Sequence, residues 1–184
     1  MTTSLPQITT LPSLPPSSQS SLLSTLFEPS PHLLPLLSPI LLTSPPFESY
    51  TSLINAIRTR LHTLTSSATT SAEDKEALDS ILSSHPRLGA KQDSEAKVGM
   101  SDLSKTEQRN LGSEQEREEL RRLNGEYEGR FGGLRVFVNG RGRDVIMEDM
   151  KRRIERGDVE LERREAVDAM CDIALDRVRK LSEE

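Results

Sequence analysis

The sequence predicts an all-α protein, a compact multi-helix single domain that contains one short extended segment. After residue 47 the apolar residues recur at the spacing of one helix face, as Tyr50, Leu53, Ile54 and Ile57 illustrate. The stretch Leu134 to Asn139 has the composition of a strand, but no second stretch offers it a partner. Helices are therefore expected to form the regular structure of the fold.

The composition limits both the architecture and the function. A chain of 184 residues fits one domain, which we place at residues 21–184, after a flexible Ser/Thr/Pro-rich arm over residues 1–20. The net charge of −5 argues against a nucleic-acid-binding protein, whose contact surface is basic. No apolar run reaches the roughly 18 residues that a membrane span needs. The single cysteine, Cys171, excludes an internal disulfide and a cysteine-based metal site.

The first half of the chain alternates proline-rich and regular stretches. Leucine pairs lie between prolines over residues 31–46, where Pro35 and Pro39 predict short helical turns rather than one helix, because interior prolines are costly. A helix is expected from Phe47 to about Leu64, with His62 on its solvent side.

The second half contains four predicted helices. The first begins at Ser71 and ends at the His85-Pro86 corner. The second carries apolar residues from Leu120 to Phe131 and ends at Gly132-Gly133. The third ends near Gly157, and the fourth runs from about Leu161 to Leu181. Residues 87–103 are expected to form a loop.

His85 stands at an unusual place in the sequence. Ten of the eleven prolines lie in the first 46 residues, and the eleventh is Pro86, directly after this histidine. A proline at this point ends a helix and holds the preceding residue extended, so His85 is presented at a rigid corner. Most histidines are ordinary core or surface residues, but the proline, with Gly89 and Lys91 close behind, favours a functional site.

Two further features each allow two interpretations. Arg177 occupies a core-facing position of the last helix. In one interpretation its aliphatic stem covers the edge of the core and its charged head reaches water. In the other, its guanidinium points inward and binds a carboxylate. Ser104 and Glu107 have the spacing of a capping box at a helix start. A helix N-terminus also suits an anion, so the cap and an anion site are compatible.

Taken together, these residues resemble one enzyme family. His85-Pro86-x-Leu88-Gly89-x-Lys91, followed by Ser104-x-x-Glu107-Gln108, is similar to 2-oxo-4-hydroxy-4-carboxy-5-ureidoimidazoline (OHCU) decarboxylases of the fungal type. The resemblance extends back to Leu26-Phe27-Glu28 and Phe47-Glu48-Ser49-Tyr50. It continues through Leu123-Asn124-x-x-Tyr127-x-x-x-Phe131-Gly132, Val136-Phe137-Val138-Asn139-Gly140-Arg141 and Arg177.

The resemblance implies an all-α homodimer that converts OHCU to (S)-allantoin in urate degradation without a metal or an organic cofactor. His85 would be the catalytic proton donor, with Glu107 orienting the substrate and Arg177 holding its carboxylate or an adjacent oxygen. A histidine changes charge near neutral pH, which suits proton delivery. The implied substrate-binding residues are Pro86, Ser104, Lys105, Thr106, Gln108, Arg135, Val136, Phe137, Val138 and Asn139.

A second hypothesis is a non-catalytic helical interaction module, with the proline-rich arm recruiting partners. Its docking face would consist of Arg130, Arg141, Arg143, Lys151, Arg152 and Arg153. Alternatively, Glu148, Asp149 and Glu155 balance the positive charge of these residues, which then form an ordinary solvated face. We favour this second interpretation. Convergence of His85, Glu107 and Arg177 on one pocket would favour the enzyme.

The compartment follows only from weak signals. The sequence begins without a basic segment typical of secretion, since its first arginine is Arg58. The final residues, Leu181 to Glu184, differ from a Ser-Lys-Leu peroxisomal signal. A cytoplasmic or peroxisomal location is therefore expected.

Overall fold

The structure is a computed structural model that describes residues 5–43, 46–88, 114–137 and 141–182. Within these ranges it contains helices and no strand, so the all-α prediction is confirmed. The helices in chain order are η1 (Ile8–Ser13), α1 (Pro16–Phe27), α2 (Leu33–Leu41), α3 (Tyr50–Ser67), α4 (Ala72–Ser83), α6 (Glu114–Arg130), α7 (Arg143–Arg156) and α8 (Val159–Ser182).

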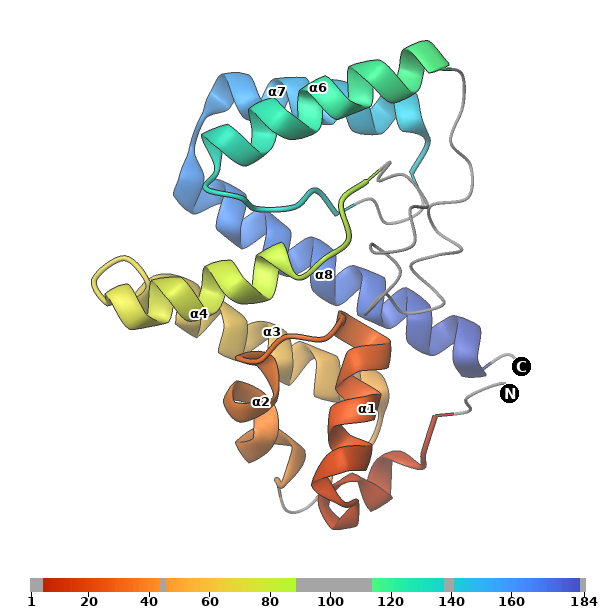
Figure 1. Ribbon diagram of the computed structural model, residues 1–184. Helices are drawn as coiled ribbons and strands as arrows, with labels where there is room; N and C mark the ends of the chain where they lie inside the picture. Colours follow the sequence, from red (N-terminus) through yellow and green to blue (C-terminus); the bar gives the residue numbers. More distant parts are fainter. Residues whose placement is uncertain (1–4, 44–45, 89–113, 138–140, 183–184) are drawn as a thin grey trace.

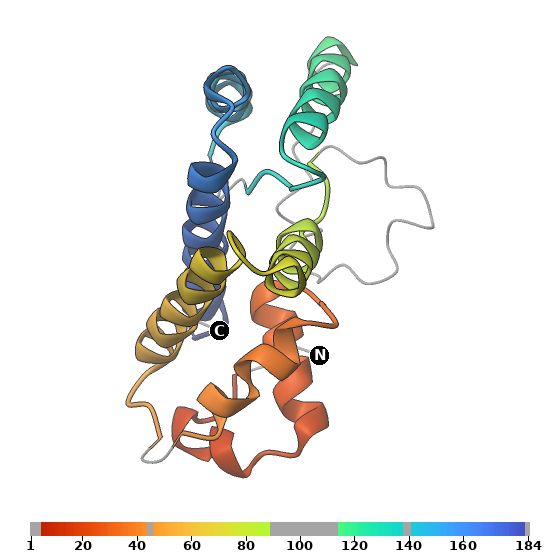
Figure 2. The same ribbon diagram turned by 90° about the vertical axis from the view of Figure 1, so that its left-hand side faces the viewer.

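Helix α8 is the element that joins the two ends of the molecule. It crosses the molecule diagonally, with α1, α3 and α4 packed against it on one side (Figure 1). Helices α6 and α7 pair with each other at the opposite end (Figure 2). Long helices that cross in this way bring residues distant in sequence close together in the centre of the fold.

The helix boundaries follow from local chemistry. Ser49 and Ser71 cap α3 and α4 by accepting hydrogen bonds from the backbone N–H groups of Ser52 and Asp74. Gly157 ends α7 in the left-handed conformation, with φ of +63°, which favours glycine. The apolar faces then meet in one core built mainly from leucine and isoleucine, including fully buried Leu53, Ile57 and Leu78.

The first twenty residues differ in arrangement from the expected separate arm. Helix α1 begins at Pro16, so the expected boundary at residue 20 lies inside it. Leu11 is buried, and its carbonyl accepts a hydrogen bond of 3.1 Å from the buried Gln19 side chain. The Tyr50 hydroxyl donates to the Pro6 carbonyl at 2.7 Å. From residue 5 onward, this segment therefore packs against the helices that follow it.

One local prediction is wrong and another is incomplete. Residues 33–41 form one helix rather than short turns, because Pro35 lies in its first turn, where a missing N–H costs nothing, and only Pro39 is interior. His62 lies off the buried stripe of α3 with its side chain 35% exposed, and its Nε2 atom also lies 2.9 Å from Oδ1 of Asp168 on α8. Among the described residues, no helix is both long enough and apolar enough to cross a membrane.

Candidate active site

His85 lies at the corner where α4 ends, as the sequence predicts. The helix stops at Ser83, and Pro86 directs the chain away from the helix axis. The imidazole stacks on the Phe137 ring, with centroids 4.4 Å apart and planes at 27°. Phe137 belongs to the extended segment after α6, so the stack joins two of the predicted site segments.

Helix α6 holds both of these segments in place. Arg87, two residues after His85, donates from Nε to Glu128 Oε1 at 2.8 Å. The same carboxylate forms an ion pair with Arg135 of the extended segment. The buried Asn124 side chain donates to the Leu88 carbonyl at 2.8 Å. Glu128 therefore connects the His-Pro corner to the extended segment.

The extended segment is fixed at its two ends. Gly132 and Gly133 have φ of +67° and +88°, so the chain leaves α6 through a turn that favours glycine. At the other end, Arg141 donates to the Phe137 carbonyl at 2.9 Å and pairs with Asp149 on α7 at 3.0 Å. These contacts hold Phe137 where its ring meets His85.

The guanidinium of Arg177 points into the protein, as the second interpretation of its position expected. Its side chain is 1% exposed, and Nη2 lies 2.8 Å from Oε1 of Glu28, which is equally buried. Nη1 also donates to the backbone carbonyls of Thr25 and Leu26, at 3.2 and 3.3 Å. The cation is thus held by the C-terminal end of α1, where carbonyl groups favour positive charge.

Glu28 is a site residue that the sequence reasoning did not single out. It follows α1 with φ of +80° and ψ of +149°, and it is the non-glycine residue with positive φ among those the structure describes. Such a conformation costs a non-glycine residue on the order of 1–3 kcal/mol. A signal was present, because Glu28 is the single Asp, Glu, Lys or Arg in the first 47 residues.

The surroundings of His85 strongly disfavour its charged form. They lower its pKa from 6.5 to about 4, first because burial removes water from the imidazolium and second because the Arg177 charge repels it. The carboxylate of Glu28 acts in the opposite direction. The buried charges of Arg177 and Glu28 therefore act on His85 in opposite directions.

The structure brings together some of the predicted site residues and leaves others untested. His85 stacks on Phe137, and the charge of Arg177 acts on the His85 imidazole. Pro86 follows His85 in sequence, whereas the Arg135 side chain is directed to Glu128 and Val136 is buried. The predicted catalytic residue Glu107 lies outside the described part of the chain, as do the predicted substrate-binding residues Ser104, Lys105, Thr106, Gln108, Val138 and Asn139.

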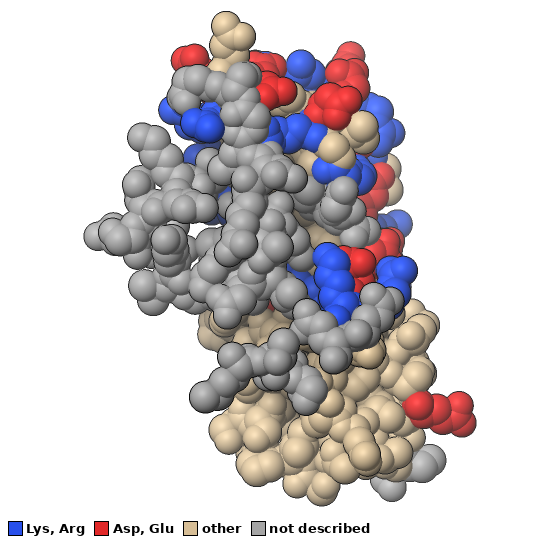
Figure 3. Space-filling view, turned by 90° about the vertical axis from the view of Figure 1, so that its right-hand side faces the viewer, with Lys and Arg blue, Asp and Glu red and all other residues tan. Residues whose placement is uncertain are grey.

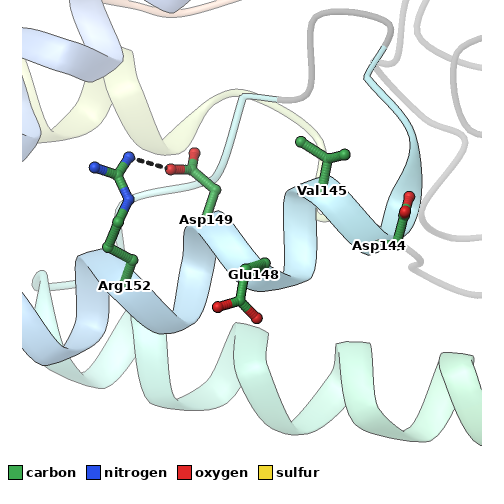
Figure 4. A pocket seen from close by; sticks show the side chains of 5 residues that line it. All are labelled: Asp144, Val145, Glu148, Asp149 and Arg152. Atoms are coloured by element: carbon green, nitrogen blue, oxygen red, sulfur yellow. Dashed lines mark hydrogen bonds and ion pairs between the residues drawn. The ribbon is translucent and has the colours of Figure 1, made fainter.

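A surface hollow lies on α7. It is lined by Asp144, Val145, Glu148, Asp149 and Arg152, and Asp149 within it is paired with Arg152 (Figure 4). The lining is mainly acidic, which does not suit an anionic ligand. Within the described ranges, no group of three or more His, Cys, Asp or Glu side chains is placed to hold a metal ion.

The arginine-rich group of the interaction-module hypothesis is balanced by acids. Asp149 pairs with Arg141, Arg152 and Arg153. Arg143 lies 3.8 Å from Glu116, and Lys151 lies 3.3 Å from Glu119. Figure 3 shows basic and acidic side chains intermixed on this end of the molecule and no broad basic patch in that view. The face has the character of a solvated surface.

One known protein family matches most of this chain. The model of the family described as OHCU decarboxylase matches residues 12–179, which is most of the chain. The search of curated proteins found no match.

Proposed function

Because the chain belongs to the OHCU decarboxylase family, a family of carbon–carbon lyases, we propose that His85, Arg177 and Phe137 form the core of its active site. The family decarboxylates 2-oxo-4-hydroxy-4-carboxy-5-ureidoimidazoline in urate degradation. The observation that carries the proposal is the stack of His85 on Phe137 together with the buried, oriented guanidinium of Arg177, whose charge acts on the His85 imidazole. The interaction-module alternative gains no comparable support.

The reaction makes three demands on the protein. A carboxylate must be bound, the electron pair left when CO₂ departs must be stabilised, and one proton must be added to one face of the ring. The substrate itself delocalises the electron pair into its neighbouring imine. Binding and proton delivery remain for the side chains, and positioned acid–base groups typically contribute about 10²–10⁴-fold in rate.

Arg177 suits the binding of the carboxylate. Its guanidinium is already oriented by Glu28 and by the carbonyls of Thr25 and Leu26, so little conformational freedom is lost when an anion binds. A planar cation in a buried site also holds a carboxylate more strongly than one in water does.

His85 suits the delivery of the proton once the substrate is bound. The depressed pKa of the free protein leaves the imidazole neutral near pH 7. A substrate carboxylate beside Arg177 adds negative charge, which offsets the repulsion and raises the pKa of His85. Substrate binding is therefore linked to proton uptake, and the imidazolium can then protonate the ring. The Phe137 ring fixes the imidazole plane for this transfer.

The remaining predicted residues complete the proposal. Glu107 would orient the substrate, and Ser104 to Gln108 and Val138 to Asn139 would contact its ring and ureido groups. We also propose that the protein is a homodimer in the cytoplasm or the peroxisome. Sedimentation velocity tests this proposal, because a homodimer has twice the 20.5 kDa mass of the chain.

The proposed role of Arg177 is tested by replacing it with lysine. Arg177→Lys keeps the charge but loses the planar fork, so we expect kcat/KM to fall about 10- to 100-fold, as for the loss of a charged hydrogen bond of about 1.5–3 kcal/mol. Arg179→Lys, on the exposed side of the same helix, is the matched control. Equal kcat/KM in the two variants would remove Arg177 from the site.

A further inference from the structure

We propose that Glu28 is a positioning residue of the reaction, which aims the Arg177 guanidinium and supplies a fixed negative charge inside the buried site. The inference rests on the proposed function, because it assigns Glu28 to the same site. Glu28 itself acts through two other side chains rather than on the substrate.

The first support is the geometry of the pair. Glu28 and Arg177 are each 1% exposed, and their charged atoms lie 2.8 Å apart. An arginine side chain has several rotatable bonds, and the Glu28 carboxylate restricts the orientation of the guanidinium plane. Three acceptors from one short stretch of chain, Glu28 with the carbonyls of Thr25 and Leu26, therefore set the orientation of Arg177.

The second support is the backbone of Glu28. Its φ of +80° and ψ of +149° lie in a region that only glycine occupies without strain. A residue needed only to turn the chain before Pro29 would be served by glycine. A strained conformation persists only where the surrounding contacts impose it, and the contact made by the Glu28 side chain is the buried pair with Arg177.

The third support is the electrostatic setting of His85. Among the described residues, two charged groups act on this imidazole: Arg177 on α8, which opposes protonation, and Glu28 after α1, which favours it. Phe137, the ring stacked on His85, carries no charge. Glu28 therefore counteracts the cation that binds the substrate, and one active site can hold both a fixed arginine and a histidine that must become charged.

The test separates the effect of the Glu28 charge from the effect of its side-chain length. Glu28→Gln keeps the length and an oxygen that accepts from Arg177, but removes the charge. Because His85 must be protonated to act, kcat declines as pH rises through its pKa in the complex. The variant lowers that pKa, so we expect the declining limb to move to lower pH by about 0.5–1 unit. A purely structural defect would lower kcat equally at every pH.

Two further variants frame this result. Glu28→Asp keeps the charge but shortens the side chain, so kcat should fall while the limb stays within about 0.2 unit of wild type. Glu48→Gln is the matched control, because Glu48 is exposed and is the next acidic residue along the chain. It should leave both kcat and the pH profile unchanged.

The outcomes distinguish this inference from the proposed function. A wild-type protein that forms no allantoin refutes the function itself. A wild type that turns over, with an unshifted limb in Glu28→Gln, refutes only the role of Glu28. Should Glu28→Gln fail to fold, wild-type kcat in Glu28→Asp refutes the positioning role. Titration of the His85 ring by NMR, in a protein with three histidines, reports the charge effect without turnover.

Discussion

The imidazole of His85 and the phenyl ring of Phe137 are stacked with their centroids 4.4 Å apart. The stack is the direct link between the His-Pro corner after α4 and the extended segment after α6. Both segments are also tied to Glu128 through Arg87 and Arg135. The position of the histidine thus depends on helix α6, which contributes no proposed catalytic side chain of its own.

Removing the aromatic ring should disturb the reaction more than the fold. Phe137→Leu keeps an apolar side chain but removes the stacked surface, which is worth about 0.5–1.5 kcal/mol for an aromatic pair. We expect kcat to fall about 3- to 10-fold, because the imidazole is less well oriented. Steady-state kinetics on the purified variant measure this, and an unchanged kcat would show that the stack has no part in orientation.

Glu128 should act as a link between the two site segments. Glu128→Gln removes the charge that holds Arg87 and Arg135, so we expect kcat to fall about 3- to 10-fold. The free energy of unfolding should fall by only about 1 kcal/mol, because these ion pairs are partly exposed. Kinetics and urea unfolding measure the two effects.

The control for this link lies on the same helix. Glu126 pairs with Arg122 on the exposed side of α6. Glu126→Gln should alter neither kcat nor stability appreciably. Equal losses of kcat in the two variants would mean that α6 affects the site only through general stability.

The depressed pKa of His85 predicts a pH-dependent stability. In the unfolded chain this histidine gains a proton near pH 6.5, whereas in the fold it does so only near pH 4. Its contribution is therefore present above about pH 6.5 and is lost as pH falls toward 4, on the order of 1–3 kcal/mol in total. Urea unfolding at several pH values should show that His85→Ala lacks this loss. Parallel pH profiles for the two proteins would contradict it.

Much of the fold could be predicted because it depends on local patterns. The periodicity of α3 and α8, the Ser71 cap and the glycines after α6 each specify local structure from neighbouring residues. The docking of residues 5–20 could not be predicted from the sequence, since it depends on long-range contacts such as that of Tyr50 with Pro6. A Ser/Thr/Pro-rich composition alone does not reveal such contacts.

The site was predictable in part for the same reason. The His85 corner follows from the adjacent proline. The core-facing position of Arg177 follows from the apolar stripe, but its inward guanidinium was one of two open interpretations until the structure showed it buried. Glu28 required the three-dimensional structure, because its partner is on the last helix and its strained backbone has no sequence signature before a proline. Its isolation in an uncharged stretch was the available signal.

The central claim is that His85 is the proton donor of a stereospecific decarboxylase. The most direct measurement follows freshly generated OHCU by circular dichroism with wild-type protein, with His85→Ala, and with buffer alone. The account predicts rapid formation of (S)-allantoin by the wild type. It also predicts that His85→Ala, while retaining the helical spectrum of the fold, gives only the slow racemic decay of the buffer. Turnover by His85→Ala at the wild-type rate would contradict the account.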